Sequence, residues 1–210
     1  MINTLISNYP ALAGCKDDIL KAFELLKSTF EKKGILLVCG NGGSAADAEH
    51  MVGEMMKTFN LERPLPVDLK EKLTNDYKSE GAFLAGHLQC SLTAISLVSQ
   101  TSLTTAIGND VSADLIFAQQ VIGYGKPGDI LFAITTSGNS KNILNAVYTA
   151  KVMGLKVIGL TGRTGGKIKK YCDLAICVPA DETPRIQELH VPVYHTLCAM
   201  LEDHFFGEKN

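Results

Sequence analysis

The sequence predicts an α/β fold in which a parallel sheet is covered by helices on both faces. Short apolar runs of strand length alternate with segments of helical periodicity, and turns rich in small residues follow several of the runs. The strands are expected at 35–39, 92–98, 129–135, 156–161 and 174–178. Helices are expected at 16–33, from Ser44 onward, at 141–153 and at about 184–205; Ser44 has the spacing to Asp47 that is typical of a helix cap.

Size and composition favour one ordinary globular domain. The chain has 210 residues and a formal net charge of -2, and it shows no basic stretch. This argues against nucleic acid and an anionic membrane as main partners, but it leaves room for a small anionic ligand. Six cysteines without a C-x-x-C pair indicate reduced thiols, and neither a signal peptide nor a membrane span is recognisable. A cytoplasmic protein is therefore expected.

We interpret residues 1–210 as a single domain that opens with a helical segment, about 1–33. The only irregular region is about 65–91, which is charged in its first half and interrupts the step from helix to strand. We interpret it as a helix-containing surface insertion. A functional lid is the alternative.

Two loops carry the residue types that bind phosphate. Asn41-Gly42-Gly43-Ser44 follows the first strand, and Thr135-Thr136-Ser137-Gly138-Asn139-Ser140 follows the third. At the carboxyl end of parallel strands, a helix N-terminus offers free N–H groups, and Ser and Thr add hydroxyl donors. The alternative is that both loops are ordinary helix caps. A single such loop would favour that interpretation, but two such loops, each between a strand and a helix, favour an anion-binding site. Neither the dinucleotide nor the nucleoside triphosphate glycine motif is present.

Candidate acid–base and metal-binding side chains lie on two predicted helices. His50 and Glu54 are four residues apart, so they share one helix face and could hold a metal ion or act on one substrate. The last helix carries Gln187, His190 and His195. Each of these residues alone is compatible with a purely structural role.

Together these stretches resemble the phosphoheptose isomerases, a branch of the sugar isomerase (SIS) domain family. The resemblance covers nearly the whole chain outside 65–91. It is carried by CGNGGSAADAEHMVGE at 39–54, AIGND at 106–110, GDILFAITTSGNSKNI at 128–143, VIGLTGRTGG at 157–166 and RIQELHVPVYH at 185–195.

The resemblance implies a five-stranded parallel sheet, a homotetramer, and isomerisation of sedoheptulose 7-phosphate to D-glycero-D-manno-heptose 7-phosphate. It implies an acid–base pair, Glu54 and His195, and one divalent metal per site, Zn²⁺, on His50, Glu54, Gln187 and His195. The implied substrate contacts are Asn41, Gly42, Gly43, Ser44, Glu54, Asn109, Asp110, Thr135, Thr136, Ser137, Ser140 and Gln187.

The chain departs from the family pattern at several positions. Thr135 stands where relatives often have Ser, and Thr58, beside Lys57, stands where several have a basic residue. Pro192 inside the last helix predicts a kink. The segment 65–91 has no counterpart in the enterobacterial-type members.

Gln187 and His195 are too far apart on one ideal helix to bind one ion easily, with about 12 Å of rise and roughly 80° of rotation between them. Three arrangements stay open: Gln187 precedes the helix, Pro192 bends it, or different protomers complete the site. In the third arrangement, Glu54 and His195 meet across a subunit interface.

Two other functions are weighed against the isomerase. A relative of the same branch binds the bacterial replication initiator, and it lacks an acidic residue at position 54 and an imidazole at position 195. A sugar-phosphate sensor would keep the Ser/Thr loops without needing an acid–base pair. Glu54 and His195 favour the enzyme.

Overall fold

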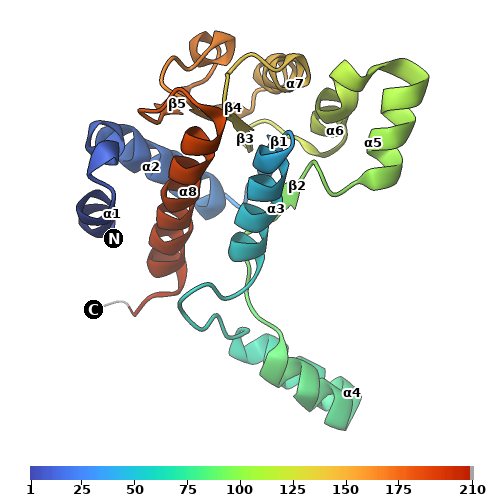
Figure 1. Cartoon of the computed structure of the whole chain (residues 1–210). Helices are drawn as coiled ribbons and strands as arrows, with labels where there is room; N and C mark the ends of the chain where they lie inside the picture. The colour runs from blue at the N-terminus through green and yellow to red at the C-terminus, as the bar shows by residue number, and fades with distance from the viewer. Residues whose placement is uncertain (209–210) are drawn as a thin grey trace.

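The computed structural model describes residues 1–208; the last two residues of the predicted 1–210 domain lie outside that range. Five parallel strands form one sheet in the order β2-β1-β3-β4-β5 (Figure 1). The strands are β1 (Leu36–Gly40), β2 (Ala94–Ser96), β3 (Ile130–Thr135), β4 (Lys156–Thr161) and β5 (Leu174–Cys177). The predicted α/β class and the five-stranded parallel sheet are confirmed.

Helices cover both faces of the sheet, as the apolar strands require. On one face lie α1 (Ile2–Asn8), η1 (Pro10–Cys15), α2 (Lys16–Glu31), α3 (Gly43–Met56) and α8 (Thr183–Phe206). On the other lie α6 (Ile116–Tyr124), α7 (Lys141–Val152) and η4 (Lys167–Lys170). Val38 and Phe132 face the first layer, while their neighbours Leu37 and Leu131 face the second. The central strands are therefore buried on both sides.

Between β2 and β3 the chain forms helical structure that the sequence did not lead us to expect, ending in α6. Before α6 it consists of α5 (Thr101–Ile107), a π-helical turn η2 (Gly108–Ser112) and a short 3₁₀ turn η3 (Ala113–Leu115). Strand β2 has three residues instead of the predicted seven, because the chain turns away from the sheet edge after Ser96.

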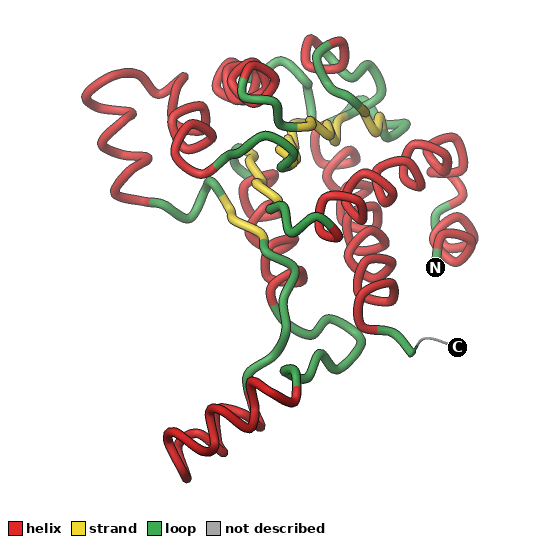
Figure 2. Tube along the Cα trace, turned by 180° about the vertical axis from the view of Figure 1, so that it is seen from behind, coloured by secondary structure: helices red, strands yellow, loops and turns green. Residues whose placement is uncertain are grey.

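The helix α4 (Val67–His87) fills most of the predicted insertion and projects away from the body (Figures 1 and 2). Lys78 has a φ of 53°, so α4 is two helical limbs joined by a sharp turn. The limbs pack closely, because a Cβ on Gly81 would collide with the backbone of Leu73. An antiparallel bridge between Pro64 and Gln89 closes the base of this arm.

All six cysteines are free, in agreement with the predicted reduced thiols. Burial raises the pKa of the Cys39 and Cys198 thiols, which makes both poor nucleophiles. Within residues 1–208, no helix has the length and apolar character needed to cross a bilayer.

Candidate active site

The two predicted phosphate loops lie side by side because β1 and β3 are neighbours in the sheet. The chain leaves β1 toward β2 on one side and continues from β3 on the other, so a crevice opens at their carboxyl ends. Asn41 and Asn142 join the loops by two reciprocal amide hydrogen bonds of 2.8 and 2.9 Å. Asn142 is a site-forming residue that the sequence reading did not identify.

The loop after β3 is held in a compact turn at the N-terminus of α7. Gly138 has a φ of 64°, and a Cβ there would collide with the backbone of Gly165. The Ser137 hydroxyl accepts a hydrogen bond from the Asn139 N–H at 3.1 Å, and the Thr135 and Ser140 hydroxyls lie 3.4 Å apart. The structure therefore gathers three of the predicted hydroxyl donors, with Thr136 in the same loop, at one helix end.

The loop after β1 leads into α3 one residue earlier than predicted. Gly42, with a φ of 55°, is the N-cap, and no side chain caps the helix. The predicted Ser44–Asp47 cap is therefore wrong: Ser44 lies inside the helix, buried against Gly40. Gly43 has no side chain, and the Gln187 amide occupies the space that a Cβ would fill.

The candidate acid–base groups meet at the far end of α3. His50 Nε2 lies 3.3 Å from Glu54 Oε1 and 3.4 Å from His195 Nε2. All three residues belong to one chain, so Glu54 and His195 do not need a subunit interface to come together, unlike in the third arrangement left open above. They come together because α3 and α8 pack against each other.

Gln187 lies away from this cluster. Gln187 lies inside α8, so the arrangement in which it precedes the helix is wrong. Pro192 also lies inside α8, and the helix continues past it. The rise along α3 from Gly43, which Gln187 contacts, to His50 is about 10 Å. The chain thus places Gln187 beside the phosphate loops and not beside His50.

The surroundings of Glu54 and His195 suit proton transfer. The Glu54 carboxylate has 12% of its side chain exposed, and Lys57 contacts its second oxygen at 3.2 Å. Burial and the neighbouring His50 lower the pKa of His195, while Glu54 partly offsets this effect. His195 is therefore a neutral imidazole at neutral pH, able to accept or donate a proton.

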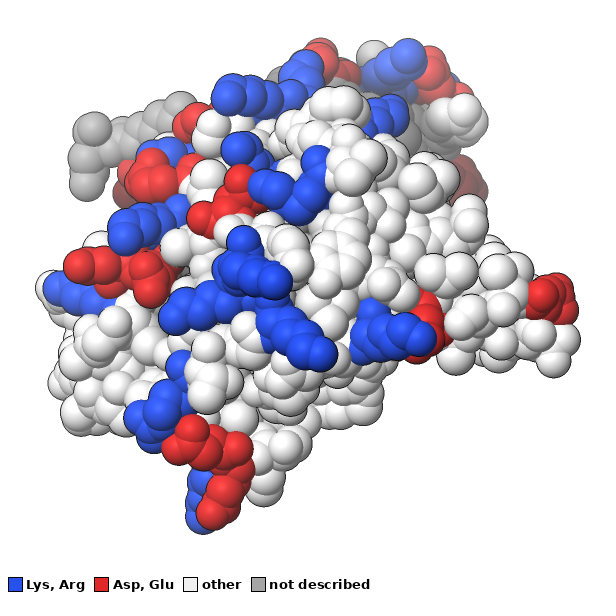
Figure 3. Space-filling view, turned by 90° about the horizontal axis from the view of Figure 1, so that it is seen from above, with Lys and Arg blue, Asp and Glu red and all other residues white. Residues whose placement is uncertain are grey.

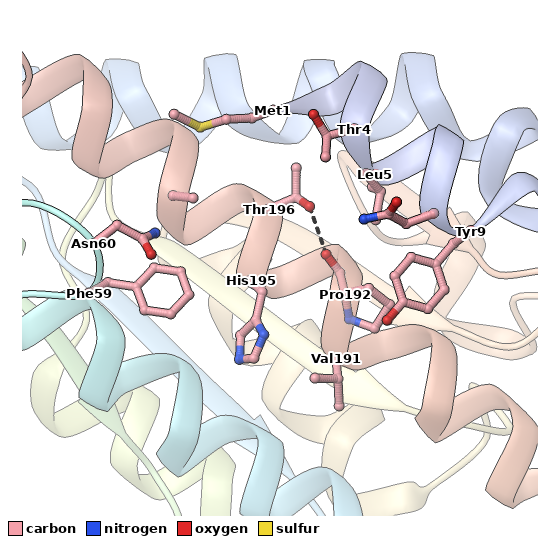
Figure 4. A pocket seen from close by; sticks show the side chains of 12 residues that line it. Met1, Thr4, Leu5, Tyr9, Phe59, Asn60, Val191, Pro192, His195 and Thr196 are labelled. Atoms are coloured by element: carbon pink, nitrogen blue, oxygen red, sulfur yellow. Dashed lines mark hydrogen bonds between the residues drawn. The ribbon is translucent and has the colours of Figure 1, made fainter.

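A cavity of about 540 Å³ opens beside His195, between α1, the loop after α3, and α8. In Figure 4 the His195 ring lies between Phe59 on one side and Val191 with Pro192 on the other, with Tyr9 across the cavity. The Phe59 and His195 ring centroids are 5.4 Å apart. A second hollow of about 370 Å³, which also reaches Val191, is lined by Gly43, Asp47 and Gln187.

Asn109 and Asp110 lie on the exposed turn η2, where they bond to each other at 2.8 Å. Within the described chain, no hydrogen bond connects them to the other predicted site residues. His190 faces the interior: it is fully buried, and burial lowers its pKa to about 4. His190 therefore has a structural role, which was one of the two possibilities left open by its position in the helix.

The surface around the crevice carries charges of both signs. Figure 3 looks down on this end of the molecule, and neither Lys and Arg nor Asp and Glu cover it alone. The loops themselves offer an anion neutral hydroxyl donors and helix N-termini.

Comparison with known proteins identifies the family. A model of the SIS domain matches residues 11–85 and 84–162. A phosphoheptose isomerase of Helicobacter pylori (strain P12) is 40% identical over 95% of this chain and 90% of its own length. A phosphoheptose isomerase of Rhodospirillum rubrum is also 40% identical, over 91% of this chain and 88% of its own length.

Solved structures agree with the sequence matches. The phosphoheptose isomerase of Neisseria gonorrhoeae superposes with a TM-score of 0.70 at 37% identity, covering 88% of this chain and 86% of its own. That of Francisella tularensis gives 0.72 at 33% identity, with coverages of 94% and 90%. The chain therefore belongs to the SIS domain family, among its phosphoheptose isomerases.

Proposed function

We propose that this chain is a sugar-phosphate isomerase that converts sedoheptulose 7-phosphate to D-glycero-D-manno-heptose 7-phosphate. The family supports a heptose-phosphate isomerase, since the similar proteins of H. pylori and R. rubrum carry that name. The observation that carries the proposal is the contact of Glu54 and His195, through His50, within one chain. A module that only binds sugar phosphate has no need of this arrangement.

The substrate would lie along the line from the phosphate loops to His50. Its phosphate would accept hydrogen bonds from Thr135, Thr136, Ser137 and Ser140 and from the first N–H groups of α7. Its sugar chain would pass the N-terminus of α3, formed by Asn41, Gly42, Gly43 and Ser44, and Gln187 beside it. Asn109 and Asp110 complete the proposed contact set from η2.

The reaction needs two kinds of proton transfer. One proton leaves C1 of the ketose and a proton is delivered to C2, through an enediol, while the hydroxyl proton moves from O1 to O2. A carboxylate such as Glu54 suits the carbon-bound proton, and the neutral imidazole of His195 suits the oxygens. Both groups are required whichever of them acts first.

We propose one divalent metal ion, Zn²⁺, at this cluster. The two measured separations, 3.3 and 3.4 Å, match the roughly 3.3 Å between ligand atoms of a tetrahedral ion with bonds near 2.0–2.1 Å. His50, Glu54 and His195 would hold it. Gln187 of the same chain lies beside Gly43, so it would join this metal set only in the arrangement in which different protomers complete the site. Within residues 1–208, no group of three His, Cys, Asp or Glu side chains is already arranged to hold a metal ion, so these side chains would have to move to bind it. When bound, the ion would stabilise negative charge on the substrate oxygens.

Turnover and binding must be measured together to test this function. Purified wild-type chain, Glu54→Gln and His195→Asn would each be incubated with sedoheptulose 7-phosphate and followed by NMR. We expect fast turnover only with the wild type, turnover slowed on the order of 10²–10⁴-fold in both variants, and substrate binding with all three proteins. Binding without turnover by the wild type would favour the sensor. Capture of the bacterial replication initiator, together with no turnover, would favour the initiator-binding relative.

A further inference from the structure

A buried chain of polar groups lies behind His50, on the side away from Glu54. The Tyr194 hydroxyl is 3.0 Å from His50 Nδ1 and 3.3 Å from Asp47 Oδ1. The Tyr194 side chain is fully buried, and Asp47 is 9% exposed. Asp47 and His50 are one turn apart on α3, so a single side chain from α8 reaches both.

The direction of these hydrogen bonds follows from counting protons. A phenol has one proton and can give it to Asp47 or to His50. Asp47 Oδ2 already has no partner within residues 1–208. If Tyr194 donated to His50, both oxygens of a buried carboxylate would lack a donor, which is costly. Tyr194 therefore donates to Asp47, and its oxygen accepts the Nδ1–H of His50.

The hydrogen bond from His50 Nδ1–H to Tyr194 determines the protonation state of the other ring nitrogen, Nε2. With its proton on Nδ1, neutral His50 presents a lone pair at Nε2, the atom that faces Glu54 and His195. His50 then cannot donate to Glu54; it can accept from the Nε2–H of His195 or bind a cation. The hydrogen bond made by one ring nitrogen thus decides what the other can do.

We propose that Tyr194 and Asp47 are positioning residues that hold His50 in the Nδ1–H tautomer, so that Nε2 is presented as an acceptor to the reaction centre. This inference deepens the proposed function and rests on it for its catalytic meaning. The tautomer itself can be read without substrate or metal. A failed isomerase assay would therefore not affect the tautomer measurement. Failure of the proposed function and failure of the proposed tautomer can thus be told apart.

The direct test is imidazole NMR on the full-length, ¹⁵N-labelled protein without metal. At pH 8, above the ordinary histidine pKa of about 6.5, long-range ¹H–¹⁵N correlations distinguish the two neutral tautomers of each of the five histidines. A His50→Gln variant assigns the His50 signals. We expect wild-type His50 to be the Nδ1–H tautomer. An Nε2–H tautomer in the wild type would overturn the proposal.

Two variants and a control separate positioning from general packing. In Asp47→Ala the Tyr194 hydroxyl loses its acceptor and turns to His50 Nδ1, so the tautomer should reverse to Nε2–H. In Tyr194→Phe the ring packing is kept but Nδ1 loses its partner; kcat and Zn²⁺ affinity should each fall about 10- to 100-fold, with KM little changed. Tyr148→Phe, at an exposed tyrosine of α7, should change neither. An unchanged tautomer in Asp47→Ala, with the amide spectrum showing a folded chain, would contradict the proposal even if Tyr194→Phe failed to fold.

Discussion

Ser137 and Ser140 each place one hydroxyl in the turn before α7, where the phosphate is proposed to bind. Replacing either by alanine removes one donor to a charged group, so substrate binding should weaken by roughly 1–3 kcal/mol. The Michaelis constant and the thermal unfolding of each variant would be measured. Ser79→Ala on α4, whose hydroxyl donates a hydrogen bond to Glu80, is the matched control. If both Ser137→Ala and Ser140→Ala bind normally, the phosphate lies elsewhere.

The candidate site shows which residue contacts sequence can predict. His50 and Glu54 could be paired in advance because four residues along a helix bring side chains onto one face. The approach of His195, and the place of Tyr194 behind His50, depend on how α8 packs on α3, which periodicity does not encode. The Asn41–Asn142 bonds likewise depend on which strands are neighbours.

At the scale of elements, a buried ion pair fixes the end of the helix that carries Glu54. Arg63 and Glu202 are each 1% exposed and 2.8 Å apart. Arg63 donates to the carbonyls of Glu54 and Met55, and Glu202 accepts the N–H groups of the following loop. This clamp supplies donors to carbonyls at the end of α3, where the helix itself offers none.

Removing the charge of Glu202 should destabilise the fold in a pH-dependent way. Burial alone would raise the pKa of Glu202, but the N–H groups of Phe59 and Asn60 and the Arg63 guanidinium lower it below its usual range. Its stabilisation is therefore present above the unfolded pKa of about 4.3 and is lost as pH falls through the lower folded value. Glu202→Gln should cost about 3–5 kcal/mol at pH 7, as for other broken buried pairs.

Denaturant unfolding from pH 7 to pH 3 measures this effect. The gap between wild type and Glu202→Gln should narrow as the pH falls below about 4.3. Glu24→Gln, in the exposed pair with Lys27, is the control and should change stability little. Equal stability of wild type and Glu202→Gln at pH 7 would show that the clamp does not stabilise the fold.

The arm α4 buries few of its residues and makes few contacts with the rest of the protein. Only Gly81 and Ala85 of its residues are buried, while Tyr77 and Phe83 are 61% and 63% exposed. The two chain segments at its base are joined to each other independently of α4, since the Cys90 N–H bonds to the Arg63 carbonyl at 2.7 Å. This favours the surface insertion over the lid, and the choice between them can be tested.

Replacing residues 66–88 with a short glycine linker should leave a folded chain with unchanged kcat and KM. The flanking bridge at Pro64 and Gln89 brings the cut ends together, so the linker need not be long. Circular dichroism and steady-state kinetics would be compared with the full chain. A folded variant with a strongly reduced kcat would identify α4 as a lid.

The elements themselves were largely predictable, and the misses have physical causes. β1, β3, β4 and β5 begin or end within one residue of the predicted bounds, because each is a short apolar run bounded by polar turns. The prediction that Ser44 caps α3 is wrong because Gly42, with a positive φ, is the N-cap and α3 begins before Ser44. Residues 101–115 lack a strong apolar period, and their helical turns have no buried residues to mark a face.

At the scale of the whole molecule, the homotetramer and the cytoplasmic location stay predictions. Exposed apolar side chains on the α5–α6 side, among them Leu103, Val111 and Ile122, offer a surface for association. Light scattering on the purified protein should give four times the chain mass of 22.6 kDa. A chain that is monomeric at assay concentrations would contradict the tetramer but not the site, since Glu54 and His195 lie in one chain.

The central claim is that this chain moves a proton between neighbouring carbons of a heptose phosphate. It is tested most directly by incubating the protein with sedoheptulose 7-phosphate in D₂O and reading the product by NMR. We predict D-glycero-D-manno-heptose 7-phosphate carrying deuterium at C2, because a base that exchanges with solvent delivers the proton there. Glu54→Gln should form it on the order of 10²–10⁴-fold more slowly. No product from the wild type, or wild-type turnover by Glu54→Gln, would contradict the account.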